Sequence, residues 1–517
     1  MRRYLYTGVF FAGCASLAVE LSASRLLGNY FGSSNLVWAA IIGLVLIYLS
    51  AGYTLGGKWA DRSPEYKTFF SILMWASFFI GLVPLASRPI LRAASQAFDQ
   101  MRTAELFGSF VSVLLLFSLP ITLLGTASPF AVRLALEEKE SAGRTAGRIY
   151  AISTLGSFIG TFLPVLVLIP AIGTYRTFVV ISAMLMVPAW IGLWRTVGLM
   201  SALKFLWMPA VLIAATFYGL SGIDKIANNV IYEGESAYNY IQVQETNDYH
   251  ILRLNEGQCV HSIYHPTIKN FHGYWEQVLV APFFYPPADH PQEVSRIAIL
   301  GLAAGTIANQ AAAVFPNAAI DGFEIDPEII DVGYALFDMN RTNLTVFVED
   351  ARWGISRSDN LFDIISVDAF RPPYIPWHLT TREFFKEIHG HLTEKGTLVI
   401  NVARIFNDRR LVNALYMTIR SVFPSVYVVD IPDTLNSMIF ATKINTEKDN
   451  LVNNYILISE SEDPSVLLLN TLEIAILNQQ PAPQAGPVFT DDLAPVEWIT
   501  NAMIFDLFFS ENVEELH

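Results

Sequence analysis

The chain has 517 residues, of which 53% are hydrophobic and only 15% charged, which is too apolar for an ordinary soluble protein. Lys and Arg outnumber Asp and Glu by 17 to 9 in residues 1–225, whereas the acids outnumber the bases by 38 to 16 in residues 226–517. The acidic second half argues against a nucleic-acid partner, which would require a basic face. The two cysteines, Cys14 and Cys259, indicate neither a disulfide framework nor a metal site, and no metal is expected.

Seven apolar runs in the first half approach the length of helix, about 20 residues, that crosses roughly 30 Å of hydrocarbon. Inside a bilayer the backbone must satisfy its own hydrogen bonds, so each run is expected to be a helix. We therefore predict a transmembrane domain over residues 1–222 with about seven helices. The runs cover residues 5–27, 36–55, 69–85, 107–123, 149–168, 178–193 and 206–220.

Two charged residues, Glu20 and Arg25, belong to the first run. An ionisable group in hydrocarbon is costly unless it is paired or hydrated. We expect the two to form a packing ion pair or an interfacial anchor, and the alternative is a polar pathway for a cation.

The basic residues of the N-terminus and of the loops near residues 58–67 and 133–148 predict that these parts face the cytoplasm. Seven spans would then place the second half outside. An enzyme that uses a cytosolic nucleotide would instead lie in the cytoplasm, which requires one span to be miscounted. We expect a multi-pass protein of the cell inner membrane with a cytoplasmic soluble domain, but the parity of the spans leaves the side open.

The second half is predicted to be a soluble domain over residues 223–517. It begins with a β-rich lead at residues 230–265, in which residues 238–243 and 250–254 alternate like the strands of a hairpin. A nucleoside-binding α/β core is expected at residues 290–445. Residues 446–517 form a C-terminal segment with an amphipathic helix.

The core begins with a βαβ pattern of about 30 residues. A buried strand at residues 296–300 leads into a turn with the small residues Gly301, Ala303 and Gly305, and a second strand ends at Glu324. Small residues let the backbone approach a ligand, and a carboxylate at the end of the second strand can accept both ribose hydroxyls. This pattern predicts a nucleoside site.

Acids also follow the next two predicted strands, Asp350 after residues 346–348 and Asp368 after residues 362–367. Acids at successive strand ends point into one crevice, the usual ligand position in an open α/β sheet. The alternative is that each acid caps the helix that follows it. Farther along, His378 lies in a segment expected to form a lid, and we expect it to cap the next helix rather than act as a base.

From about residue 235 to residue 402 the sequence resembles the spermidine synthase family of polyamine aminopropyltransferases, and the whole chain resembles the membrane-fused branch of that family. The matching segments are Glu235-Ser236 with Tyr238, Tyr274 with Glu276, residues 301–306, 324–327, 350–352 and 363–368, and Asp491-Asp492. The resemblance implies a multi-pass α-helical membrane domain. It is followed by a Rossmann-like α/β domain of the S-adenosylmethionine methyltransferase type, with a small N-terminal β-hairpin region.

The resemblance further implies a membrane-bound enzyme of polyamine biosynthesis. It would transfer an aminopropyl group from decarboxylated S-adenosylmethionine, or use S-adenosylmethionine itself, with a small amine such as putrescine as acceptor and no metal. Asp368 would be the catalytic base. Assembly into a homo-oligomer stays open. The residues implied to bind the nucleoside are Gly301, Ala303, Gly305, Glu324, Asp350 and Ala351, and those implied to bind the substrate are Tyr274, Glu276, Asp491 and Asp492.

Two departures from the family pattern argue against putrescine as the acceptor amine. Soluble aminopropyltransferases carry an acid where this chain has Ala304, and a second acid where it has Arg371. Losing one anionic contact and gaining a cation weakens the binding of a cationic amine. Two alternatives therefore stay open: another enzyme that uses S-adenosylmethionine, such as a methyltransferase or lyase, and a non-catalytic membrane module for binding or transport.

Overall fold

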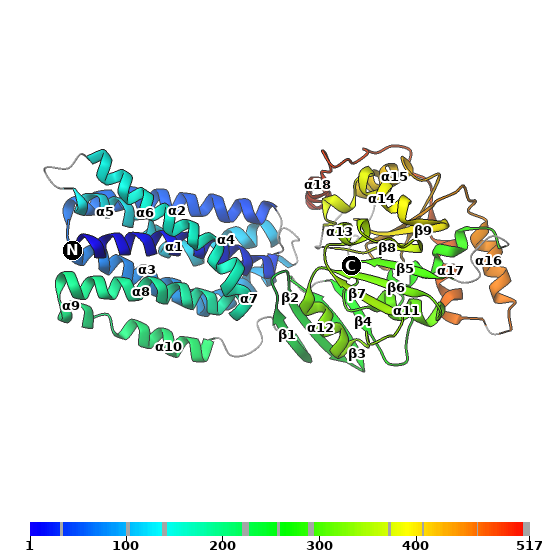
Figure 1. Cartoon of the computed structure of the whole chain (residues 1–517), viewed down its shortest axis with the longest axis horizontal. Coiled ribbons are helices and arrows are strands. Elements are labelled where there is room, and N and C mark those ends of the chain that lie inside the picture. Colours follow the sequence, from blue (N-terminus) through cyan, green and yellow to red (C-terminus); the bar gives the residue numbers. More distant parts are fainter. Residues whose placement is uncertain are drawn as a thin grey trace. The chain divides into compact units, whose positions relative to one another are not determined.

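The structure is a computed structural model that divides into two units (Figure 1). The first unit comprises residues 1–227 together with 235–240, and the second comprises residues 228–234 together with 241–517. The described residues are 1–31, 35–99, 104–136, 142–219, 227–255, 259–287, 294–370, 374–405, 408–462 and 464–509.

Seven helices of the first unit are long and apolar enough to cross a membrane, which confirms the predicted number of spans. Three spans continue through a short additional helix, and residue 220 of the predicted seventh run lies outside the described residues. The spans are α1 Arg2–Phe31, α2 Asn35–Arg62, α3 Tyr66–Asp99, α4 Ala104–Gly125 with α5 Ala127–Ala135, α6 Ala142–Leu163 with the π-helix η1 Pro164–Leu168 and α7 Ile169–Ile172, α8 Thr174–Val197, and α9 Leu199–Leu203 with α10 Trp207–Gly219.

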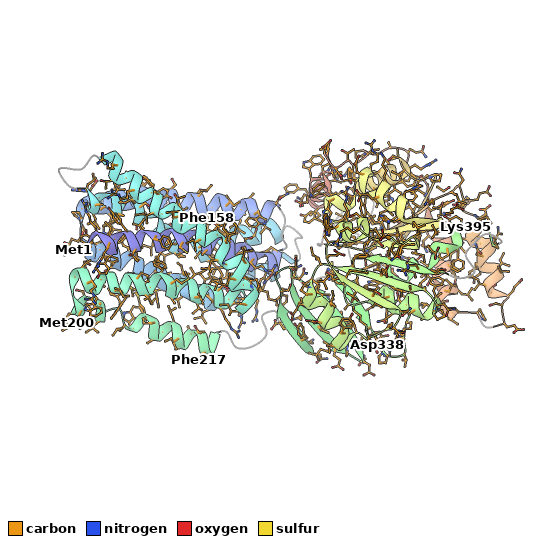
Figure 2. The ribbon with its side chains drawn as sticks, in the orientation of Figure 1. Met1, Phe158, Met200, Phe217, Asp338 and Lys395 are labelled. Carbon is orange, nitrogen blue, oxygen red and sulfur yellow. The ribbon has the colours of Figure 1, made fainter. Side chains whose placement is uncertain are left out.

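The outer face of this bundle is apolar. Phe158 and Phe217 are 63% and 79% exposed and point away from the helices that carry them (Figure 2). Burying such side chains in water-free hydrocarbon is favourable, whereas exposing them to water is not. The exposed apolar face therefore indicates that lipid surrounds the unit, as the multi-pass prediction requires.

Inside the bundle, α1 and α6 pack backbone against backbone through glycines. A Cβ atom at Gly156 would lie 2.0 Å from the carbonyl oxygen of Phe10, and one at Gly160 would lie 2.1 Å from that of Cys14. Ser157 adds a hydrogen bond of 3.1 Å to the carbonyl of Gly13. Small residues at helix crossings give close packing where no hydrophobic effect drives helices together.

Arg25 is paired with Glu235 rather than with Glu20. Its Nε lies 3.2 Å from Glu235 Oε1, and its Nη atoms donate to the carbonyls of Ser236 and Tyr238 at 2.6 and 2.8 Å. Thr174 donates its backbone N–H to Glu235 Oε2 at 2.9 Å and its hydroxyl to Oε1. This group of contacts, here named the Arg25 clamp, fastens residues 235–240 to the ends of α1 and α8.

The residues that follow the helices form a four-stranded antiparallel sheet in the order β1-β2-β3-β4. The predicted hairpin is confirmed as β2 and β3, and two further strands extend it. Its strands are β1 Val230–Glu235, β2 Tyr240–Thr246, β3 Tyr249–Leu254 and β4 Val260–Tyr264.

The core of the second unit is an eight-stranded sheet in the order β12-β10-β11-β9-β8-β5-β6-β7. Strands β7, β6, β5, β8 and β9 run parallel, and β11, β10 and β12 complete the sheet in antiparallel pairs. The strands are β5 Arg296–Leu300, β6 Ala319–Glu324, β7 Leu344–Val348, β8 Phe362–Val367, β9 Leu392–Ala403, β10 Ser425–Asp430, β11 Asn436–Thr442 and β12 Gln479–Gln480.

Both faces of the sheet are covered, which is the predicted Rossmann-like architecture (Figure 1). One face packs against α13 Ala351–Ser356, α14 Arg382–His391, α15 Arg410–Arg420 and α18 Val496–Phe509. The other packs against the 3₁₀ helix η2 Trp275–Phe284, α11 Thr306–Val314, α16 Asn450–Ser459 and α17 Val466–Leu477, and α12 Pro327–Leu336 packs beside the small sheet. The strand order reverses beside β5, which is where open α/β sheets bind ligands.

Candidate active site

The turn after β5 passes directly against the end of β8. Gly301 has φ +93°, and a Cβ atom there would lie 2.5 Å from the carbonyl oxygen of Asp368. Asp368 donates its backbone N–H to Leu300 at 2.8 Å. Gly301 therefore meets two demands that only glycine satisfies, a left-handed backbone and a close approach of another chain segment. Gly305, with φ +86°, then starts α11.

Glu324 stands at the end of β6 and faces the same turn. Its Oε2 accepts the backbone N–H of Ala303 at 2.9 Å, and its Oε1 accepts that of Asp326 at 3.1 Å. Burial raises the pKa of Glu324 to about 7. Asp326, not Glu324, caps α12, so the helix-capping alternative does not account for Glu324.

Asp368 projects from the end of β8, next to a buried amide. Asn401 on β9 donates to Asp368 Oδ1 at 3.0 Å, and Asn436 on β11 donates to Asn401 Oδ1 at 2.9 Å, which orients the Asn401 amide. Burial raises the pKa of Asp368 to about 7, and the hydrogen bond from Asn401 opposes that rise. The sequence reasoning missed Asn401, although a single amide in the apolar run at residues 397–403 is the signal that could have revealed it.

Tyr274, immediately before η2, lies within electrostatic reach of Asp368. Burial raises the pKa of the Tyr274 phenol, and the charge of Asp368 raises it further. The phenol therefore stays protonated. Tyr274 and Asp368 come from distant parts of the chain, and the fold brings these two predicted residues together with the glycine turn.

Asp350 caps the helix that follows it, which is one of the two roles considered for it. Its Oδ1 caps α13 by accepting the backbone N–H groups of Arg352 and Trp353 at 3.0 Å each. Its Oδ2 lies 3.1 Å from Nε2 of His378, and this hydrogen bond is the main reason that the pKa of Asp350 is lowered. The expectation that His378 caps the next helix is wrong, because Thr381 accepts the N–H of Phe384 at the start of α14.

Two predicted substrate ligands have partners within the protein. The Glu276 carboxylate is 2% exposed and accepts the backbone N–H groups of Phe271 and Gly273 and the amide of Gln310. Arg352 donates to both oxygens of Asp491 at 2.9 Å and also pairs with Glu387 at 2.6 Å. These contacts hold a loop and a turn in place.

The remaining positions differ in their surroundings. Asp492 is exposed, and Ala351 is buried in the first turn of α13. Ala304 is fully buried, with its N–H donated to Ser262 at 2.9 Å, and Arg371 lies outside the described residues. Among the described residues, no group of three His, Cys, Asp or Glu side chains could hold a metal ion.

Comparison with known proteins identifies the domain that carries this site. The sequence model of the family described as "Spermine/spermidine synthase domain" matches residues 288–455. This part of the chain therefore matches a domain of the spermine/spermidine synthase family. Seven long apolar helices precede it, so the resemblance inferred from the motifs is confirmed.

Relatives of the spermidine synthase domain are found at moderate identity. The chain is 35% identical over 230 residues to a Bifidobacterium longum protein named "Probable polyamine aminopropyl transferase", an alignment that covers 43% of this chain and 49%, about half, of that relative. It is 29% identical over 247 residues to a polyamine aminopropyltransferase of Vibrio vulnificus, covering 46% and 80% of the two chains. The crystal structure titled as a probable spermidine synthase from Corynebacterium glutamicum aligns with a TM-score of 0.42 at 20% identity, covering 52% of this chain and 98% of that chain.

Replacing Gly301 by Ala should disrupt the site. The added Cβ would be forced against the Asp368 carbonyl at an unfavourable φ, so we expect a loss of about 1–3 kcal/mol in unfolding free energy and weakened nucleoside binding. Thermal unfolding and titration with methylthioadenosine, both on the detergent-solubilised full chain, measure the two effects. Gly390→Ala in α14 is the matched control, because a Cβ there meets no atom within 4 Å. Equal behaviour of the two variants would contradict the packing described for Gly301.

Proposed function

We propose that the protein is a membrane-bound aminopropyltransferase. It transfers the aminopropyl group of decarboxylated S-adenosylmethionine to an amine such as putrescine, with Asp368 as the base. The observation that carries the proposal is the convergence of the glycine turn, Glu324 and Asp368 at the switch point of a spermidine synthase family domain. The names of the relatives support the same reaction class.

In this proposal the nucleoside lies across the carboxyl ends of β5, β6 and β7. The backbone from Gly301 to Gly305 passes beneath the aminopropyl tail, and Glu324 accepts the ribose hydroxyls. Asp350 accepts the amino group of the adenine, with Ala351 beside the base. Each role uses a group that the fold directs to the same edge of the sheet, where a ligand meets oriented donors and acceptors at little entropic cost.

The chemistry needs one proton transfer and one displacement. An ammonium ion has no lone pair, so the Asp368 carboxylate must first accept a proton from the acceptor amine. The amine nitrogen then forms a bond to the propyl carbon while the carbon–sulfur bond breaks. The electron pair passes to sulfur, which neutralises the sulfonium and releases methylthioadenosine. A carboxyl with a pKa of about 7 suits this task near neutral pH, and the protonated Tyr274 can donate a hydrogen bond beside it.

The part of the site that would bind the amines of donor and acceptor is where this chain differs most from the family pattern. Ala304 cannot pair with the amine of the transferred group, and the charges of Glu276 and Asp491 are already engaged within the protein. The predicted substrate roles of Glu276, Asp491 and the exposed Asp492 stay predictions. A site with fewer acids favours an amine of low charge. The lack of a carboxylate at position 304 also removes a group that would repel a carboxylated donor, and this is the feature that keeps a methyltransferase or lyase as the second candidate.

Titration of the full chain with three nucleosides separates the candidate functions. We expect decarboxylated S-adenosylmethionine and methylthioadenosine to bind in isothermal titration calorimetry, and the intact, carboxylated donor to bind more weakly. Tighter binding of the carboxylated form would favour a methyltransferase or lyase. Absence of binding by all three, in protein that unfolds cooperatively, would leave only a non-catalytic module.

Asp368→Asn should abolish turnover while leaving methylthioadenosine binding within about twofold, because the amide keeps the shape of the side chain but cannot take a proton. In the unmodified protein, kcat at saturating donor should fall as the pH drops through about 7, where Asp368 becomes protonated. Asn401→Leu removes the hydrogen bond that stabilises the charged carboxylate, so the pH at which kcat falls should be higher in this variant. If kcat falls at the same pH in Asn401→Leu as in the unmodified protein, or if turnover persists in Asp368→Asn, Asp368 is not the base.

A further inference from the structure

The two oxygens of Asp350 have separate partners. Oδ1 accepts two backbone N–H groups of α13, from Arg352 and Trp353. Oδ2 is therefore the oxygen left to meet a ligand, and it already lies 3.1 Å from His378 Nε2. A carboxylate oxygen can accept more than one hydrogen bond, so His378 leaves Oδ2 able to accept another.

His378 is itself held in place through its main chain. Its carbonyl oxygen accepts Nη1 of Arg352 at 3.0 Å, and Arg352 bridges to Glu387 on α14 and to Asp491. The charged groups that act on His378 are thus Asp350 at the imidazole, Arg352 at the carbonyl, and Asp491, whose charge interacts with that of the imidazole. The imidazole is 30% exposed, so it is reached by solvent and does not form part of the core.

We propose that His378 is a positioning residue for recognition of the nucleoside base, an inference that rests on the proposed function. The carboxylate favours the imidazole tautomer with its hydrogen on Nε2, because a lone pair facing Oδ2 would be repelled. The resulting hydrogen bond fixes the rotation of the Asp350 carboxylate. The remaining lone pair of Oδ2 then meets the exocyclic amino group of an adenine, whereas the 6-oxo group of a hypoxanthine would be repelled.

A pair of ligands that differ only at this position tests the proposal. Methylthioadenosine and methylthioinosine have the same sugar and tail, and calorimetry on the full chain gives both dissociation constants. His378→Ala should weaken methylthioadenosine binding about five- to tenfold, the effect of one lost hydrogen bond, and should leave methylthioinosine binding unchanged. His378→Gln, which keeps an N–H donor, should recover most of the loss. Equal losses for both ligands, or no loss for either, would overturn the role of His378.

A second variant separates this inference from the proposed function. Asp350→Asn keeps an oxygen that can cap α13 and directs an amide N–H₂ toward the ligand, so its preference should shift toward methylthioinosine. That shift together with an unaffected His378→Ala variant would overturn the inference and leave the base contact of Asp350 standing. If the unmodified protein binds neither ligand, the proposed function fails and the inference with it.

An independent observation concerns the two ends of the helical unit. Met1 and Met200 lie at the same end of the unit (Figure 2). Arg2 donates to the carbonyl of Ala135, and Arg133 of the same helix pairs with Asp61, so these residues belong to this end too. Successive spans run in opposite directions, so the position of each described Lys and Arg along its helix shows at which end of the unit it lies. This end has ten, namely Arg2, Arg3, Lys58, Arg62, Lys67, Arg133, Arg144, Arg148, Arg195 and Lys204, and the opposite end has four, namely Arg25, Arg88, Arg92 and Arg176.

We infer that the end with ten basic residues faces the cytoplasm and that the site operates on the other side of the membrane. Basic loops are retained in the cytoplasm during insertion. The last span ends at Gly219 at the opposite end, where the Arg25 clamp also holds residues 235–240. The second unit follows from there. A transport step across the membrane must then deliver the nucleoside to the site, which places the reaction after export of that substrate.

The two native cysteines allow a direct test. Cys259 is exposed in the second unit and Cys14 is buried in α1. In a Cys14→Ala background, a membrane-impermeant maleimide should label Cys259 in intact cells or spheroplasts. With Cys259→Ser, a cysteine introduced at Lys395 serves as a second reporter of the same side, and one introduced at Glu65 should be labelled only after permeabilisation. Labelling of Glu65→Cys in intact cells, with protection of both Cys259 and Lys395→Cys, would overturn the inference.

Discussion

The site depends on the close approach of two strand ends, those of β5 and β8. Because Gly301 lacks a Cβ atom, the backbone of Asp368 can lie against it and donate to Leu300. The left-handed turn that follows presents the N–H of Ala303 to Glu324. The missing Cβ of Gly301 therefore sets the position of the Asp368 carboxylate, at the end of β8, relative to the Glu324 carboxylate, at the end of β6. The parallel sheet keeps the two strand ends in register.

Two carboxyl groups with pKa values of about 7 stand at the ends of β6 and β8, the strands on either side of β5, and their environments give them different functions in the proposed reaction. Glu324 receives two backbone N–H groups, which stabilise its charged form for hydrogen bonding to hydroxyls. Asp368 accepts a hydrogen bond from one neutral amide, that of Asn401, and is half-buried at the end of β8. A cationic amine that enters beside Asp368 would favour the carboxylate form, so the substrate itself would promote the protonation state that the reaction requires.

Much of the fold could be predicted from the sequence, because apolar runs report burial directly. The strands around residues 296–300, 319–323 and 362–367 and the seven spans follow from run length and from the small or acidic residues at their ends. Polar pairings could not be predicted in this way. The hydrogen bond from Asn401 to Asp368 and the pairing of Arg352 with Asp491 join segments 33 and 139 residues apart, and no local periodicity encodes which polar groups meet. His378 was misjudged because Thr381, three residues later, was available as a better cap.

The Arg25 clamp implies that the junction between the two units is interleaved in sequence. Residues 235–240 return to the helical unit after the chain has already entered the second one, and Glu235 finds its partners 61 to 210 residues earlier in the chain. A chimera that joins the helices of one relative to the α/β domain of another would therefore have to transfer Arg25, Asn29 and Thr174 together with Glu235. A fragment that starts near residue 226 would contain Glu235 but lack Arg25, the cation that pairs with it. Evolution of the two halves is thus constrained to proceed jointly at these four positions.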